Sequence, residues 1–246
     1  MPREPHRRHV VILAPMPLEM DAIVAAFGRS PANDAKGAPW TGRVGNSDVT
    51  AIHIGMGPPP TRAATSRLFD ENVAGYVPVA HVMIVGICGG LDPLVPVGTL
   101  INPEVVVDHS SGMSYRHTPP GGASVKGKLV TTEGVTLDPD LCERLLSDGC
   151  VAVDMETAAV AEVCEAHRCP WSVYRCIGDR PVDGLVDDRV LALTNPDGSG
   201  NMAELERLIA EDPAFAATLD RLAHDSALAA RLAAEAAARG CLALDA

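Results

Sequence analysis

The fold is decided by the stretch Val151–Asp183, which reads VAVDMETAAVAEVCEAHRCPWSVYRCIGDRPVD. A short apolar run leads into Asp154, Met155 and Glu156. From Met155 to His167, apolar residues recur at three- and four-residue spacing, which predicts a helix. Glu156 is therefore expected near the start of a helix, where rigid backbone can aim its carboxylate.

A predicted strand completes this stretch. The turn Cys169-Pro170 ends the helix, and the apolar residues of Trp171–Ile177 then predict a buried strand. Because Gly178-Asp179 follows directly, Asp179 is a second carboxylate at the end of a regular element. Each acid also has a plain structural explanation, Asp179 in a turn and Glu156 at a helix N-terminus.

The composition is that of a globular protein. The 246 residues suffice for one substantial α/β core or two small domains. Apolar residues make up 47% and aromatic residues only 3%, so the core must consist mainly of Val, Leu, Ile and Ala. The formal net charge of −12 argues against nucleic-acid or anionic-membrane partners, which normally require a basic face.

The seven cysteines form no CxxC pair. The basic start of the chain lacks the apolar core of a secretory signal, and no run approaches the ~18 apolar residues of a membrane span. We therefore expect reduced thiols in a cytoplasmic protein, without a metal site or a cofactor. Residues 1–9 are predicted to be a flexible tail, and residues 10–246 a single domain.

The chain begins with a predicted strand and helix. Val10–Ala14 is short and β-branched, as in a buried strand, and Leu18–Phe27 has helical spacing. Glu19 falls at the junction, on the side where open α/β sheets bind ligands. By position alone, Glu19 is better explained as an acid that stabilises the helix dipole by ~0.3–1 kcal/mol.

Two glycine clusters follow predicted strands. Val49–Ile54 runs into GMGPPP at 55–60, and His81–Val85 runs into GICGG at 86–90. The first cluster is not a dinucleotide fingerprint, because Pro60 occupies the third glycine position, and this argues against an NAD-dependent enzyme. Glycine turns let backbone approach a ligand closely, so two of them favour a pocket.

The remaining segments also alternate between helix, strand and loop patterns. Helices are expected at Thr61–Asn72 and Asp138–Leu146, strands at Leu100–Ile101, Val105–Val107 and Lys128–Thr132, and loops at Leu91–Thr99, Ser110–Lys126 and Pro181–Ser199. The long loop Ser110–Lys126 is either a lid over the site or a surface loop.

The C-terminus is rich in alanine and has helical patterns. After a helix at Glu204–Ala210, Asp212-Pro213 opens the next one. Asp225 or Ser226 is expected to cap a last helix, which Gly240 should end. We expect this tail to pack on the body of the protein, with an oligomer surface as the alternative. The alternating elements predict one α/β domain with a mixed or largely parallel sheet.

Four patches in this order resemble the purine and uridine phosphorylase superfamily. They are MPLEM around Glu19, the GMG turn at Gly55, GICGGL at Gly86, and VDMETAAVA together with CIGD. The motifs resemble most the nucleosidases that cleave methylthioadenosine and S-adenosylhomocysteine, and are also similar to hopanoid-associated and futalosine-type members. The resemblance implies a three-layer α/β/α domain with a central mixed, largely parallel sheet. It also implies a homo-oligomer, with a dimer favoured.

The resemblance further implies roles for individual residues. Asp179 would be the acid that meets the purine N7, and Glu19 would activate water. Glu156 would accept hydrogen bonds from the ribose hydroxyls while Met155 packs on the sugar. Arg175 would orient Glu156 or Glu19. Positions implied to face the base or the pocket are Val135, Gly86, Ile87 and Met16.

Three departures from the family pattern bear on the nucleophile and on the substrate. Ile87 stands where phosphorylases carry a phosphate-holding Ser or Thr, and Ile84 where an arginine often helps. Val135 replaces the phenylalanine that stacks on the base in the nucleosidases. We therefore expect hydrolysis of an adenosine derivative. A phosphate-dependent phosphorylase, with Arg62 near the phosphate, and a non-catalytic nucleoside-binding relative are the alternatives.

Overall fold

A single mixed sheet runs through the molecule. A computed structural model of the chain describes residues 7–28, 39–72, 76–117, 127–195 and 199–244. Ten strands in these ranges join the sheet: β1 (Arg8–Ala14), β2 (Trp40–Val44), β3 (Ser47–His53), β4 (His81–Gly90), β5 (Leu100–Ile101), β6 (Val105–Asp108), β7 (Ser114–Tyr115), β8 (Lys128–Thr131), β9 (Cys150–Asp154) and β10 (Trp171–Asp179). The predicted α/β class with a mixed sheet is confirmed.

The strand pairing brings several carboxyl ends to one edge. The order is β2-β3-β1-β4-β9-β8-β6-β7, with β10 paired to β4 and to β5. β1 is parallel to both β3 and β4, and β10 is parallel to β4. β9 meets the end of β4 in the antiparallel sense. The ends of β1, β4, β9 and β10 therefore converge, and ligands bind at such edges of α/β sheets.

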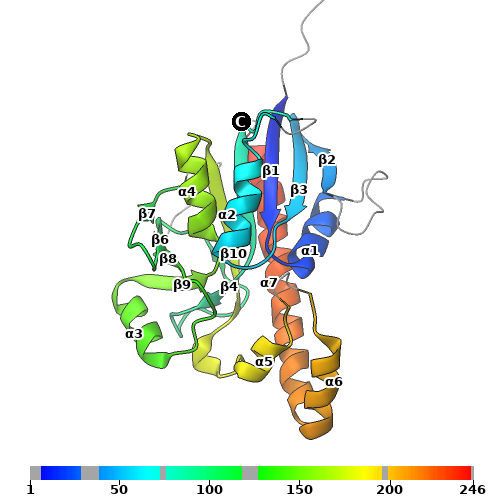
Figure 1. Cartoon of the computed structure of the whole chain (residues 1–246), viewed down its shortest axis with the longest axis vertical. Helices are drawn as coiled ribbons and strands as arrows, with labels where there is room; N and C mark the ends of the chain where they lie inside the picture. Colours follow the sequence, from blue (N-terminus) through cyan, green and yellow to red (C-terminus); the bar gives the residue numbers. More distant parts are fainter. Residues whose placement is uncertain (1–6, 29–38, 73–75, 118–126, 196–198, 245–246) are drawn as a thin grey trace, which may run out of the picture.

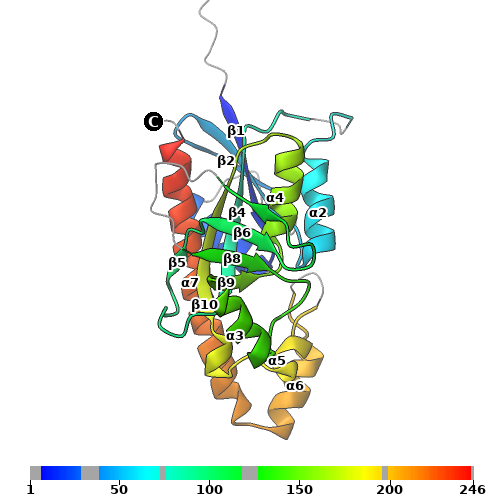
Figure 2. The same ribbon diagram turned by 90° about the vertical axis from the view of Figure 1, so that its left-hand side faces the viewer.

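Helices cover both faces of the sheet. They are α1 (Pro17–Phe27), α2 (Pro58–Arg67), α3 (Pro139–Ser147), α4 (Thr157–Ala166), α5 (Asp188–Ala192), α6 (Met202–Glu211) and α7 (Phe215–Ala243). Figure 1 shows α2 and α4 in front of the sheet and α7 behind it, and the turned view in Figure 2 shows the same three layers from the side. α5, α6 and the first half of α7 lie below the sheet.

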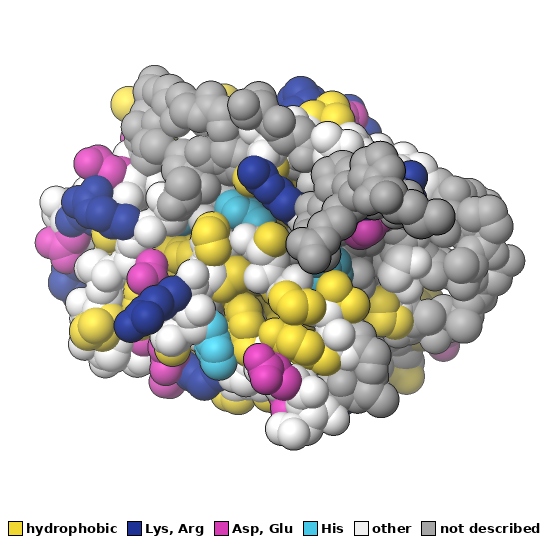
Figure 3. Space-filling model, turned by 90° about the horizontal axis from the view of Figure 1, so that it is seen from above, with side chains coloured by type: hydrophobic (Ala, Val, Ile, Leu, Met, Phe, Trp, Pro, Cys, Tyr) yellow, Lys and Arg dark blue, Asp and Glu magenta, His cyan; other side chains and the backbone are white. Residues whose placement is uncertain are grey.

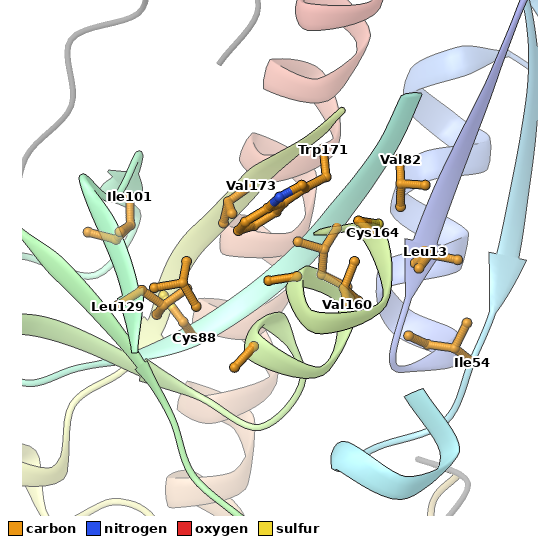
Figure 4. Packing of buried hydrophobic residues seen from close by; sticks show 14 of the residues in the cluster. Leu13, Ile54, Val82, Cys88, Ile101, Leu129, Val160, Cys164, Trp171 and Val173 are labelled. Atoms are coloured by element: carbon orange, nitrogen blue, oxygen red, sulfur yellow. The ribbon is translucent and has the colours of Figure 1, made fainter. Parts of the chain in front are cut away.

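Each face of the sheet has its own hydrophobic core. On one face, Trp171 and Val173 of β10 pack with Val160 and Cys164 of α4, as Figure 4 shows. On the other face, the fully buried alanines of α7 are small enough to let the helix lie close to β4 and β10: Ala229, Ala230, Ala233, Ala234 and Ala237. The expectation that the C-terminus packs on the body is confirmed.

One end of the sheet carries an apolar surface patch. Seen from above, the end where β1 starts carries hydrophobic side chains in the middle of the face, with charged side chains around them (Figure 3). Val77, which is 53% exposed, lines a shallow groove there with Arg7 and His9.

Within the described residues, none of the helices is long and apolar enough to cross a membrane.

Two expected breaks are absent because tertiary contacts override the local signals. β4 does not end at Val85 but continues through the glycines to Gly90. α7 runs unbroken past Asp225 and past Gly240 to Ala243. A side chain at Gly240 would overlap the Tyr174 hydroxyl, so this glycine allows close packing on β10 and does not end the helix.

Several boundaries also differ from the sequence expectations. β1 begins at Arg8, two residues before the expected start. α2 spans Pro58–Arg67, where a helix at Thr61–Asn72 was expected, because prolines at the first turn need no N–H partner. α4 starts at Thr157, after Met155 and Glu156.

The segment expected as the loop Pro181–Ser199 contains helix α5, which Asp187 caps by accepting hydrogen bonds from two backbone N–H groups. Residues 1–6 of the expected tail and 118–126 of the expected loop lie outside the described residues.

Candidate active site

A cavity of about 180 Å³ lies where the ends of β1, β4, β9 and β10 converge. Eight of the nine positions singled out from the sequence line this cavity: Met16, Glu19, Ile87, Val135, Met155, Glu156, Arg175 and Asp179. They come from five separate parts of the chain, which the fold brings together. The ninth, Gly86, lies directly behind the cavity wall, opposite Arg175 in the sheet register.

Arg175 is the centre of a buried ion cluster. Its side chain is only 1% exposed, and its Nη2 lies 2.8 Å from both Asp154 Oδ2 and Glu156 Oε2. Its Nη1 lies 3.5 Å from Glu19 Oε1. One guanidinium thus contacts three carboxylates through its fixed fork of donors, which sets their relative positions.

Gly86 explains how two charged side chains, those of Glu19 and Arg175, fit behind the cavity. A Cβ at this position would overlap the Glu19 carboxylate and lie 2.7 Å from Arg175 Nη1. The glycine is therefore needed for space in the middle of a strand, and not for a turn. This corrects the interpretation of the second glycine cluster, whose local pattern cannot show that Glu19 and Arg175 occupy this space.

Glu19 lies at the start of α1 and also lines the cavity. Its Oε2 accepts a hydrogen bond from the Met16 N–H at 2.8 Å, which stabilises the start of α1. Its Oε1 accepts from the Ile87 N–H at 2.7 Å, across the cavity wall. The side chain is 1% exposed. Burial raises the pKa of Glu19 to about 7, although the nearby Arg175 charge opposes the rise.

Glu156 is held by backbone on one side and by the ion cluster on the other. It precedes α4 with φ −133°, so it is the last residue before the helix. Its Oε1 accepts from the Gly57 N–H at 2.8 Å, and its Oε2 accepts from Arg175. Gly57 has φ +85°, which only glycine adopts readily, and this points its N–H at the carboxylate. Burial raises the pKa of Glu156.

Asp179 differs from the other acids of the cavity. Among the described residues, no hydrogen bond or ion pair holds its half-buried carboxyl group. Its neighbour Arg180 instead pairs with Asp183 at 2.9 Å. Burial, followed by the negative charge of Asp183, raises the pKa of Asp179 to about 6. The carboxyl group can therefore keep a proton near neutral pH.

Asp154 is a residue of the site to which no role was assigned from the sequence. It is 6% exposed, lines the cavity and pairs with Arg175. It also accepts hydrogen bonds from the Thr131 hydroxyl at 2.6 Å and from the Thr157 N–H and hydroxyl. Its place at the end of a short apolar run, two residues before Glu156, is a signal that could have identified it.

The residues at which this chain departs from the family pattern, and Arg62, differ in their position relative to the cavity. Ile87 and Val135 line the cavity, and Val135 is 48% exposed. Ile84 is fully buried inside β4. Arg62 does not line the cavity but pairs on the surface with Glu162, with Nη2 and Oε2 2.8 Å apart.

Comparison with known proteins places this arrangement in a family. A family model described as the phosphorylase superfamily matches residues 9–147 and 116–211 of the chain. The chain belongs to the phosphorylase superfamily. The matched residues include the four patches that carried the resemblance, and so the family inferred from the sequence is confirmed.

Named relatives resemble the chain over different shares of its length. A 5′-methylthioadenosine/S-adenosylhomocysteine nucleosidase of Pseudoalteromonas translucida is 26% identical over 170 residues, which cover 57% of this chain and 70% of the relative. The structure of the S. pneumoniae enzyme of that name has a TM-score of 0.69 at 16% identity, covering 96% of this chain and all (100%) of its own.

Another similar solved structure bears a different name. Futalosine hydrolase of Helicobacter pylori has a TM-score of 0.61 at 17% identity, and the similarity covers 92% of this chain and 97% of that one. At these identities the two solved structures show a common fold. They bear different names, so the fold leaves the substrate to be inferred from the cavity.

Proposed function

We propose that the protein hydrolyses the N-glycosidic bond of a purine nucleoside, with Asp179 as the acid and Glu19 as the base that activates water. The observation that carries this proposal is the presence of two carboxyl groups with raised pKa values, about 6 and about 7, in one cavity. Perturbed pKa values of this kind are typical of acid and base catalysts.

The reaction creates two problems that these groups can solve. Breaking the bond puts negative charge on the leaving base and oxocarbenium character on the ribose. A protonated Asp179 can donate its proton to N7 of the purine, and a placed acid typically contributes ~10²–10⁴-fold to the rate. Its lack of a cation partner helps it to keep that proton.

Water activation falls to Glu19, which needs to be ionised to accept a proton. The pKa of about 7 makes it half ionised near neutral pH and a stronger base than an ordinary carboxylate. The hydrogen bonds from Met16 and Ile87 hold it in place. This division of labour between two carboxyl groups resembles that of inverting glycosidases.

Ribose binding is the role proposed for Glu156 and Met155. Each Glu156 oxygen accepts one hydrogen bond from the protein, whereas a carboxylate has about four acceptor sites. Two sites therefore remain for ribose hydroxyls, and Met155 supplies an apolar surface beside them. Arg175 keeps Glu156 and Glu19 in a fixed relation.

The charges of the cavity favour water over phosphate as the nucleophile. Four carboxyl groups line it, and the lining cation is Arg175, which is already shared by three of them. A phosphate dianion would therefore meet repulsion without a free cation from the described lining. Arg62, the other candidate, is paired with Glu162 outside the cavity.

The names of the relatives support an adenosine derivative as substrate, such as methylthioadenosine or S-adenosylhomocysteine. The test is release of the base from these two nucleosides and from inosine and futalosine, with and without phosphate. We expect hydrolysis without phosphate. A strict phosphate requirement would favour the phosphorylase, and absence of any turnover together with tight nucleoside binding would favour a non-catalytic relative. The dimer is a separate proposal, which sedimentation can test.

A further inference from the structure

A second hollow adjoins the cavity and takes no part in the proposed reaction. This groove, of about 360 Å³, lies between α3 and the short 3-10 turn Pro181–Asp183. α3 contributes Cys142, Glu143 and Leu146 to it, and the turn contributes Val182. Its lining is apolar apart from the exposed Glu143. The groove is therefore suited to an apolar group.

The groove and the cavity share two walls. Leu137 and Pro181 line both of them, and both residues are half-buried. Pro181 follows Asp179 by two residues, and Leu137 follows Val135 by two residues. The groove is thus adjacent to the end of the cavity that holds Asp179.

The chemistry of a purine fixes which of its atoms face this wall. N7 and the substituent on C6 lie side by side on the same edge of the ring. On the other side of N7 is C8, next to the N9 that carries the sugar. With N7 at Asp179 and the ribose at Glu156 and Met155, the 6-substituent points away from the sugar. Because Pro181 lies two residues after Asp179 and lines both hollows together with Leu137, we place the 6-substituent at the wall that these two residues form.

We propose that the groove binds an apolar substituent carried on the 6-amino group of the purine, so that N6-alkylated or N6-arylmethylated adenosine derivatives are the preferred substrate class. This inference rests on the proposed function, because it needs N7 to meet Asp179. It adds a specificity site outside the residues that carry out the reaction.

Size and exposure support this assignment. Ligand pockets typically measure ~300–1,000 Å³, and the groove of about 360 Å³ lies in this range. Val182 at the groove is 64% exposed, so a bound apolar group would remove hydrophobic surface from water.

The test compares matched pairs of nucleosides on the full chain. Base release is measured for adenosine and N6-benzyladenosine, and for methylthioadenosine and its N6-benzyl derivative. We expect the benzyl compound to exceed its parent in kcat/KM in at least one pair. If a parent is cleaved but neither benzyl compound is cleaved faster than its parent, the groove does not favour the substituent and the proposed function still stands. If nothing is cleaved, both proposals fail.

Variants that fill the groove distinguish loss of binding of the benzyl group from a loss of activity toward every nucleoside. Val182→Trp and Leu146→Phe should each lower kcat/KM for the benzyl nucleoside by about tenfold, while the parent changes less than about twofold. The matched control is Leu94→Trp, because Leu94 is 89% exposed and lines neither hollow. Equal losses for parent and derivative in both filling variants would overturn the inference.

Discussion

The two acidic parts of the cavity hold their carboxyl groups in different ways. Around Arg175, three carboxylates share one guanidinium, and backbone N–H groups hold Glu19 and Glu156 as well. Asp179 has no such partner among the described residues, and its pKa rises to about 6. Burial raises the pKa of Glu19 and of Glu156 despite the Arg175 charge, so the two parts differ in how firmly their carboxyl groups are held and not in the direction of the pKa shift. Glu19 has the longest ion pair, at 3.5 Å, and a pKa of about 7.

Removing the guanidinium should have the largest effect. Arg175→Met leaves three buried carboxylates without a cation, so we expect the free energy of unfolding to fall by about 3–5 kcal/mol, with loss of measurable activity. Urea denaturation and base release check this. Arg175→Lys keeps the charge but loses the fork, and should recover stability more than activity. An Arg175→Met protein as stable as the wild type would contradict the ion-cluster account.

Removing the isolated acid should damage activity but not the fold. We expect Asp179→Asn to lower kcat/KM by ~10²–10⁴-fold. Burial raises the folded pKa of this carboxyl group to about 6, so ionising it costs stability as pH rises. Asp179→Asn should therefore be more stable than the wild type above about pH 6, with the difference vanishing below about pH 4. Thermal unfolding at both pH values tests this, and unchanged turnover would refute the proposed acid.

The dependence of kcat/KM on pH should report the ionisation of both Asp179 and Glu19. Activity should fall above about pH 6 as Asp179 loses the proton it must donate, and below about pH 7 as Glu19 gains a proton. The profile of kcat/KM is then a bell with its maximum between these values and a slope of about tenfold per pH unit on each side. Residual activity of Asp179→Asn should lack the alkaline limb. A flat profile from pH 5 to 8 would contradict both assignments.

Removing the Asp154 charge weakens the ion cluster around Arg175 but leaves Arg175 in place, so it should have the smallest effect on kcat/KM. Asp154→Asn keeps the shape of the side chain and leaves Glu19 and Glu156 on Arg175, so we expect about a tenfold loss in kcat/KM. Because the Asp154 charge raises the pKa of Glu156, that pKa should fall. Carboxyl titration by NMR measures it, and Asp140→Asn on the exposed surface of α3 is the control. An unchanged Glu156 pKa would show that Asp154 acts only through packing.

The sequence predicted those helices and strands that are marked by an apolar pattern or a capping residue within the element itself. The buried strands β1 and β10 and the capped helix α3 follow from apolar runs, Asp138 and Pro139. The positions of Glu156 and Asp179 at the ends of elements followed in the same way. The roles of these acids came from the family resemblance and remain predictions.

What the sequence did not reveal depends on distant partners. Gly86 resembles a strand end until Arg175, 89 residues later, is seen opposite it. Gly240 resembles a helix end until Tyr174 is seen against it. The partners of Asp154, Thr131 and Arg175, likewise become known only when the fold brings them to its side chain. Residue spacing carries no information about such contacts.

The hydrogen bond from the Ile87 N–H to Glu19 has a consequence for how such a protein can evolve. Replacing Ile87 by serine would add one hydroxyl donor for phosphate, but the neighbouring amide would remain engaged by a carboxylate. A single mutation at this position therefore adds a donor inside a site that still repels anions. On the proposed mechanism, phosphorolysis would also require the loss of Glu19, the base proposed for hydrolysis. A change from hydrolysis to phosphorolysis would therefore need at least two substitutions, one that adds a donor for phosphate and one that removes the base.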